Sequence, residues 1–287
     1  MATGFQGLLS RGLLSASSRL GRSFATTETP FLYRFKAKRL KWKKRHYNEV
    51  LIMADRRKLL ETLQEVIDAP GKQFPKPFWE VLSKRCIKSM HLLEPLELAI
   101  VARAFDVHQP ELRKDMDVFP SLAAQVRDSR SFVPGMAIIA LSEIFPRRLR
   151  HKEEVAELMK LFARRAANCM WEIPVDAAVS LIEELAASGV KDAALCRRVA
   201  KKLQIRLTSD LWEPNLGLLG QAAAALAAQD FRDVELFRSL VESAARCLEG
   251  SDGSADRASG RAVLDSLEVL KLELPEAEPL RKALEVT

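Results

Sequence analysis

A short run near the amino terminus has the residue types best suited to chemistry with another molecule. Between Phe31 and Tyr47 the chain has eight cations and no acidic residue. Lysine and arginine neutralise phosphate groups, and exposed aromatic rings stack on unpaired bases. The run interleaves both kinds of side chain, which predicts contact with RNA through the following residues: Tyr33, Arg34, Lys36, Lys38, Arg39, Lys41, Trp42, Lys43, Lys44 and Arg45. Contact with a protein or an anionic lipid, and an ordinary solvated segment, are the alternatives.

The formal charge of +7 belongs to this end of the chain. Residues 1–50 contain eleven Lys and Arg against Glu28 and Glu49, whereas the other 237 residues contain 34 Lys and Arg against 36 Asp and Glu. The body of the protein is therefore almost neutral. The sequence predicts that electrostatic attraction to a polyanion comes mainly from the arm.

The segment before the arm is typical of a mitochondrial transit peptide. No acidic residue occurs between Met1 and Thr27, and three arginines are spaced among leucines and serines. Arg22 precedes a point after Phe24 that resembles a matrix-protease site. We expect residues 1–24 to form the transit peptide, residues 25–47 to form a basic aromatic RNA-binding arm, and the protein to lie in the mitochondrial matrix. The alternative is an ordinary N-terminal segment.

Several classes of protein are disfavoured by what the sequence lacks. No stretch reaches about 18 consecutive apolar residues, so we expect no membrane-spanning helix. The four cysteines and four histidines have no metal-ligand spacing, and we expect reduced thiols packed in helices, no metal and no cofactor. Phosphate-binding, zinc-protease and serine-hydrolase motifs are missing. The glutamate pairs at 153–154 and 183–184 fall at positions expected to face solvent, so we predict neither an enzyme nor a small-molecule substrate.

Prolines recur through the body at an almost constant interval. Pro95, Pro134, Pro174 and Pro214 are 39, 40 and 40 residues apart, and each opens a similar apolar segment. Proline is tolerated in the first turn of a helix, where its missing N–H has no partner to lose. The four prolines therefore predict four helix starts.

A second apolar segment lies between successive prolines, so the unit is a helical hairpin of about 40 residues. These segments begin at Phe78, Val118, Val155, Leu195 and Val234. One hairpin cannot bury both of its faces, so neighbouring hairpins must stack. The predicted fold is all-α, an α-solenoid of roughly 40-residue hairpins with a basic N-terminal extension. An ordinary multi-helix globule is the alternative.

The same pattern divides the chain behind the arm. We expect an opening helix and linker over residues 48–76, the repeat solenoid over 77–248, and a flexible break followed by a helical cap over 249–287. Glycine and serine in the stretch from Glu249 to Ser254 favour the break.

The hairpin beginning Pro-x-x-(Leu/Ala)-(Ala/Ile), alternating with segments such as Asp230–Leu240, resembles octotricopeptide and heptatricopeptide arrays of organellar RNA proteins. The resemblance covers about residues 77–248 and rests mainly on apolar positions. It implies a solenoid that holds organellar RNA, in mitochondrial expression or inside protist mitochondrial ribosomes. The chain departs from these families in its short array and in lacking their C-terminal nuclease-like module.

These observations favour a non-catalytic structural component of the mitochondrial ribosome, with rRNA and mitochondrial ribosomal proteins as partners. Basic pairs recur near the expected helix ends and would either gather on one side or form ordinary helix surface; they are Arg147–Arg148, Arg164–Arg165, Arg197–Arg198 and Lys201–Lys202, with Arg150 beside the first. One alternative is an accessory subunit or assembly factor of a respiratory complex or ATP synthase, whose arm would touch cardiolipin or an acidic subunit. Another is a free-standing mitochondrial RNA processing or stability factor.

Overall fold

The computed structural model describes residues 56–129, 133–209, 215–248 and 254–285. Within these ranges the chain is all-helical, with twelve α-helices, two short 3-10 turns and no strand, which confirms the predicted class. The first six helices are α4 (Arg56–Ile67), α5 (Lys76–Ser89), α6 (Pro95–His108), α7 (Val118–Asp128), α8 (Gly135–Arg148) and α9 (Lys152–Asn168). The other six are α10 (Val175–Ala187), α11 (Ala193–Leu207), α12 (Leu216–Ala228), α13 (Val234–Leu248), α14 (Ser254–Leu270) and α15 (Ala277–Glu285).

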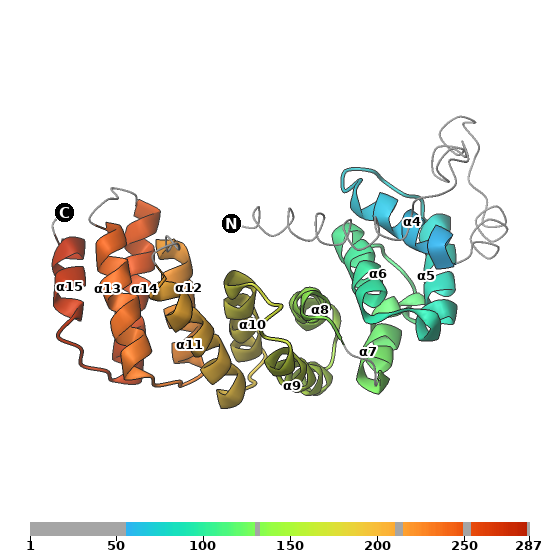
Figure 1. The fold of residues 1–287 in the computed structure, drawn as a ribbon. Coiled ribbons are helices and arrows are strands. Elements are labelled where there is room, and N and C mark those ends of the chain that lie inside the picture. The colour runs from blue at the N-terminus through green and yellow to red at the C-terminus, as the bar shows by residue number, and fades with distance from the viewer. Residues whose placement is uncertain (1–55, 130–132, 210–214, 249–253, 286–287) are drawn as a thin grey trace.

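The helices pack in two rows, and each helix contacts the next-but-one helix along the chain. The first row contains α4, α6, α8, α10, α12 and α14, and the second contains α5, α7, α9, α11, α13 and α15. Successive helices such as α8 and α9, or α12 and α13, join the two rows as hairpins. The described chain is elongated, with α4 and α5 at one end and α15 at the other (Figure 1).

One continuous apolar core runs between the rows. In the first row, the apolar residues four and five positions after Pro134 and Pro174 are buried, as expected for segments that repeat with the prolines; they are Ile138, Ile139, Ala178 and Val179. In the second row, Phe78, Phe162 and Phe237 are almost completely buried. The predicted stripe is wrong at Val234, which is 43% exposed because it lies at the first residue of α13.

The prolines do mark helix starts where the structure describes them. Pro95 is the first residue of α6, and Pro134 and Pro174 each stand one residue before α8 and α10. The difference of one residue falls within the ordinary uncertainty of a helix end. Pro214 lies outside the described residues, and α12 begins two positions after it.

Polar side chains cap several of the other helices. The Asp192 carboxylate accepts hydrogen bonds from the backbone N–H groups of Ala194 and Leu195 at 3.0 and 2.9 Å. Asn215 caps α12 through the N–H of Gly217 at 2.7 Å. Such a cap satisfies N–H groups that have no partner within the helix, and it stabilises the helix by about 1 kcal/mol.

Ion pairs connect neighbouring hairpins at a separation close to one repeat. The Arg148 guanidinium donates to the Asp106 carboxylate at 2.7 Å and to the Asp106 carbonyl oxygen at 2.8 Å. Arg147 approaches the same carboxylate at 3.4 Å. Nearer the amino terminus, Arg56 of α4 donates to Glu97 of α6 at 2.9 Å. The Asp106 side chain is only 9% exposed, so the two arginines supply the positive charge that compensates the buried carboxylate.

The last two helices extend both rows. The expected break falls at residues 249–253, which lie outside the described residues, and the expected terminal cap corresponds to α14 and α15. Helix α14 packs on α12 and α15 packs on α13. At the α12–α14 contact, a Cβ added to Gly220 would lie 2.6 Å from the carbonyl oxygen of Ser259. The two backbones therefore approach too closely for any larger residue.

The four cysteines are free thiols, as expected, although Cys169 lies in the turn after α9 and not inside a helix. None of the four cysteines forms a disulfide, and Cys86, Cys169 and Cys196 are buried. Burial raises the pKa of the Cys86 thiol to about 12. In the part of the chain that the structure describes, no helix is both long and apolar enough to cross a membrane.

The buried pair between α6 and α8 gives a first prediction. Changing Asp106 to Ala leaves Arg148 half-buried without its carboxylate, so we expect the free energy of unfolding to fall by about 3 kcal/mol. Glu61→Ala is the matched control because its pair with Arg57 is more than half exposed, and we expect it to change stability by about 0.5 kcal/mol or less. Urea denaturation measures both, and equal effects would contradict this account.

The α12–α14 contact gives a second prediction. Replacing a glycine inside a helix by alanine usually raises the free energy of unfolding by about 0.5–1 kcal/mol. At Gly220 we expect the opposite sign, a loss of about 1–3 kcal/mol, because the new methyl group meets the backbone of α14. Gly71→Ala, which meets nothing within 4 Å, is the control. Thermal unfolding of the two variants checks this, and a stabilised Gly220→Ala protein would show that α14 does not pack there.

Candidate functional site

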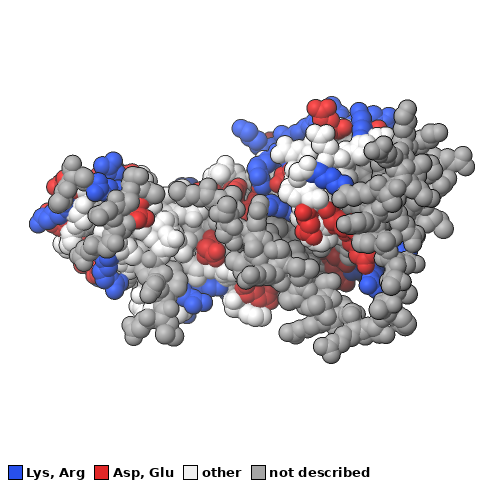
Figure 2. All heavy atoms as spheres, turned by 90° about the horizontal axis from the view of Figure 1, so that it is seen from above, with Lys and Arg blue, Asp and Glu red and all other residues white. Residues whose placement is uncertain are grey.

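The ten residues of the predicted RNA-binding arm all lie outside the described residues. In the body of the protein, the basic pairs near helix ends are the candidates for contact with phosphate. On the part of the face that Figure 2 draws in colour, Lys and Arg lie among Asp and Glu, and they gather most along the upper edge at the right-hand end.

Some of the basic pairs hold the fold together. Arg147 and Arg148 bind Asp106, as described above. Arg165 donates to the backbone carbonyl oxygens of Val126 and Ser129 at 3.1 and 2.6 Å, and partial burial lowers the pKa of its guanidinium. These side chains link neighbouring helices, and their charge is partly used inside the protein.

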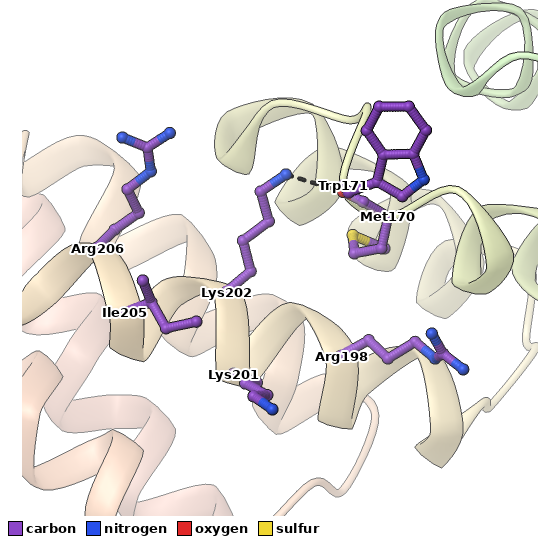
Figure 3. A pocket seen from close by; sticks show the side chains of 7 residues that line it. All are labelled: Met170, Trp171, Arg198, Lys201, Lys202, Ile205 and Arg206. Atoms are coloured by element: carbon purple, nitrogen blue, oxygen red, sulfur yellow. Dashed lines mark hydrogen bonds between the residues drawn. The ribbon is translucent and has the colours of Figure 1, made fainter.

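The basic residues of α11 are arranged differently. Arg198, Lys202 and Arg206 lie at intervals of four residues, so they follow one side of the helix. Together with the loop before α10 they line an open cavity of about 450 Å³, whose lining residues are Met170, Trp171, Arg198, Lys201, Lys202, Ile205 and Arg206. None of these seven residues is acidic. We call this group of residues the α11 surface (Figure 3).

Two large apolar side chains are exposed on the α11 surface. Trp171 is 80% exposed and Ile205 is 60% exposed, whereas Trp79, in the core at α5, is 4% exposed. In Figure 3 the indole of Trp171 lies to the side of α11 towards which Lys202 and Arg206 point, and Lys201 points away from it. Among the described residues no other aromatic ring stacks on Trp171. The indole therefore offers an open face beside several cations.

The loop that carries Trp171 is held on both sides. Cys169 and Ile173 are completely buried, and Met170 is almost so. On one side the Gly135 N–H at the start of α8 donates to the Glu172 carboxylate at 3.3 Å. A Cβ at Gly135 would overlap Ile173, so the loop and α8 are in close contact.

On the other side, Lys202 connects the loop to α11. Its ammonium group donates to the carbonyl oxygen of Met170 at 2.8 Å and to that of Ile173 (Figure 3 marks such a bond). Burial lowers the pKa of Lys202, as does the nearby charge of Arg206, while Asp176 raises it. Lys202 thus serves the structure, and Arg198, Lys201 and Arg206 remain exposed for an external anion.

A second cavity, of about 830 Å³, lies where the α4–α5 loop meets the end of α6. Its aromatic rings mainly contact one another: Phe74 meets Trp79 edge to face, with 5.8 Å between the ring centroids. His108 is bonded to the Val66 carbonyl oxygen at 2.9 Å. Its wall contains both cationic and acidic side chains, so it does not favour an anion as clearly as the α11 surface does.

One glutamate on the first row is less exposed than the sequence suggested. Glu184, expected to face solvent, is half-buried, and desolvation raises its pKa. Glu143 has a raised pKa for the same reason, with Arg103 and Arg147 opposing the shift. Neighbouring Glu183 is exposed, as expected, and accepts a hydrogen bond from Gln221. The cations beside Glu143 and Glu184 make this a charge-balanced contact between helices.

Metal ligands and known relatives give no further guidance to the site. In the described ranges no group of three or more His, Cys, Asp or Glu side chains is placed to hold a metal ion. No protein-family model matches the chain, and no curated protein matches its sequence.

The lysine that supports the loop can be tested against its neighbour. We expect Lys202→Met to lower the free energy of unfolding by about 1–3 kcal/mol, because two backbone carbonyl oxygens lose a charged donor. Lys201→Met removes an exposed ammonium from the next position and should change stability by about 0.5 kcal/mol or less. Guanidinium denaturation distinguishes them, and an unaffected Lys202→Met protein would contradict the role given to this lysine.

Proposed function

We propose that this protein is a non-catalytic, RNA-associated component of the mitochondrial ribosome, with a solenoid body of helical hairpins. The observation that carries the proposal is the α11 surface, where exposed cations surround an exposed tryptophan that the fold holds in place. Cations of this kind attract phosphates, and an open indole stacks on a base. The basic aromatic arm has the same chemistry in a more concentrated form.

The mitochondrial part of the proposal is supported by the sequence. Residues 1–24 are acid-free and contain spaced arginines and serines, as mitochondrial transit peptides do. Because the arm follows this segment directly, it would stand at or near the amino terminus of the imported protein. From there it could contact rRNA without being constrained by the helical body.

An architectural role suits the charge distribution better than sequence-specific reading of RNA. The body is nearly neutral and mixes both charges on the face seen in Figure 2, so only limited parts of it favour phosphate. Contacts to phosphate and sugar position a protein on RNA without selecting a sequence. The remaining surface would then be available for neighbouring ribosomal proteins.

Sedimentation of a mitochondrial lysate tests this proposal. We expect the native protein to migrate with a ribosomal subunit and to leave that fraction after RNase treatment. Replacing seven arm cations by Ser should also displace it, since most of the attraction to phosphate is then lost; the positions are Lys36, Lys38, Arg39, Lys41, Lys43, Lys44 and Arg45. The reading is the fraction in which the protein is detected by immunoblot.

A control with the same loss of charge separates the arm from general electrostatics. It replaces seven exposed cations of the helical body by Ser and should leave sedimentation unchanged; they are Lys84, Lys88, Lys152, Lys160, Lys191, Arg261 and Arg281. Migration with a respiratory complex or ATP synthase, indifferent to RNase, would overturn the proposal in favour of an accessory subunit. Migration in a small RNase-sensitive particle would favour an RNA processing factor.

A further inference from the structure

We infer that the α11 surface binds an unpaired nucleotide of RNA, whose base stacks on the indole of Trp171 while flanking phosphates pair with Arg198 and Arg206. The inference rests on the proposed function only in taking RNA as the ligand. It assigns a second contact, in the folded body, that is separate from the basic arm.

Trp171 lies outside the hydrophobic core, so core packing does not explain its position. It is the most exposed of the large apolar side chains in the described ranges, and it lies between Met170 and Ile173, which are both buried. Trp171 and Ile205 are both exposed and line the same cavity, and apolar side chains exposed together beside polar ones mark interaction sites. The indole has one polar atom and two broad faces, which suit a flat aromatic partner.

The second argument is that the indole is positioned before any ligand arrives. The buried residues on both sides of Trp171, the Gly135–Glu172 hydrogen bond and the Lys202 ammonium together hold the loop between α8 and α11. A ligand that stacks on a fixed ring does not have to order the loop first, so less of the binding free energy is lost.

The third argument is the placement of the exposed cations. Arg198 and Arg206 are eight residues apart on α11, which corresponds to about 12 Å along the helix axis. That span allows each guanidinium to meet a different phosphate of one strand. Lys202 lies between them but is already bonded to the loop. In Figure 3 Arg198 lies at the same end of α11 as the indole and Arg206 at the other end, so the exposed arginines continue the cationic surface along the helix, as an extended strand would require.

These features together favour a single strand over a duplex. In double-stranded RNA the bases are stacked on one another and their faces are covered, so an indole cannot reach them. In a single strand each base has a free face, and every base type can stack. An acidic protein segment would also meet the cations, but it would not need a ring held with its face open.

Binding of a labelled, unstructured 12-nucleotide RNA and of its duplex, measured by fluorescence anisotropy, tests the inference. The full-length chain with the seven arm cations changed to Ser is the background, so that the arm does not mask the body. We expect Trp171→Ala to weaken binding of the single strand about tenfold and to change duplex binding less than twofold. Trp171→Phe, which keeps a stacking ring, should stay within about threefold of the background protein.

Matched variants make each part of the site separately testable. Leu92→Ala removes another exposed apolar side chain, 59% exposed, and should have no effect. Arg198→Ser with Arg206→Ser should reduce the slope of log affinity against log salt by about 1.4 for the single strand, as expected for two lost phosphate contacts. Lys84→Ser with Lys88→Ser removes the same charge from α5 and should leave the slope unchanged.

The outcomes separate this inference from the proposed function. Equal losses for single strand and duplex in Trp171→Ala, or no loss at all, would overturn the inference while leaving ribosome association untouched. Stacking-dependent binding in a protein that does not sediment with ribosomes would support the site and reject the ribosomal role. If Trp171→Ala releases the protein from its native complex without altering RNA affinity, the ligand is a protein and the inference is wrong.

Discussion

The structure depends on one constraint: an isolated hairpin of two amphipathic helices leaves apolar surface exposed, and only the neighbouring hairpins can cover it. Each helix therefore packs on the next-but-one helix, and the two rows follow from this repetition. The contact of Gly220 with Ser259 shows how closely successive members of a row approach. Polar contacts obey the same geometry, since Arg148 reaches Asp106 from one hairpin to the next.

The same packing creates the α11 surface. The loop between α9 and α10 passes from the second row to the first, so its residues Cys169 and Ile173 are drawn into the core. Trp171, between them, is left facing outwards. Lys202 then closes the arrangement by bonding the loop from the adjacent helix. The site is therefore a consequence of how one hairpin joins the next, and it uses rigid backbone on both sides rather than a mobile lid.

Local signals in the sequence predicted the all-helical class and the helix starts, because prolines such as Pro95 act within a single turn. Stacking of the hairpins was predicted, but the ion pairs between them were not, although the repeat itself points to them: Asp106 and Arg148 are 42 residues apart, close to one unit. The basic pairs were expected either to gather on one side or to form ordinary helix surface. Those of α11 line one cavity, whereas Arg148 and Arg165 bind groups within the fold, so the pairs do not gather as one set. The exposure of Trp171 could not be predicted, since it depends on tertiary bonds from Lys202 that no local pattern encodes.

The central claim is that RNA lies against both the arm and the α11 surface. Ultraviolet crosslinking of intact mitochondria, followed by tryptic digestion and mass spectrometry, tests it most directly, because it records contacts at individual peptides in the native complex. The account predicts nucleotide adducts on the tryptic peptide of residues 166–191, which contains Trp171, and, after digestion at glutamate instead, on the peptide of residues 29–49, which contains the arm. Adducts on neither segment, with the protein recovered in good yield, would contradict it.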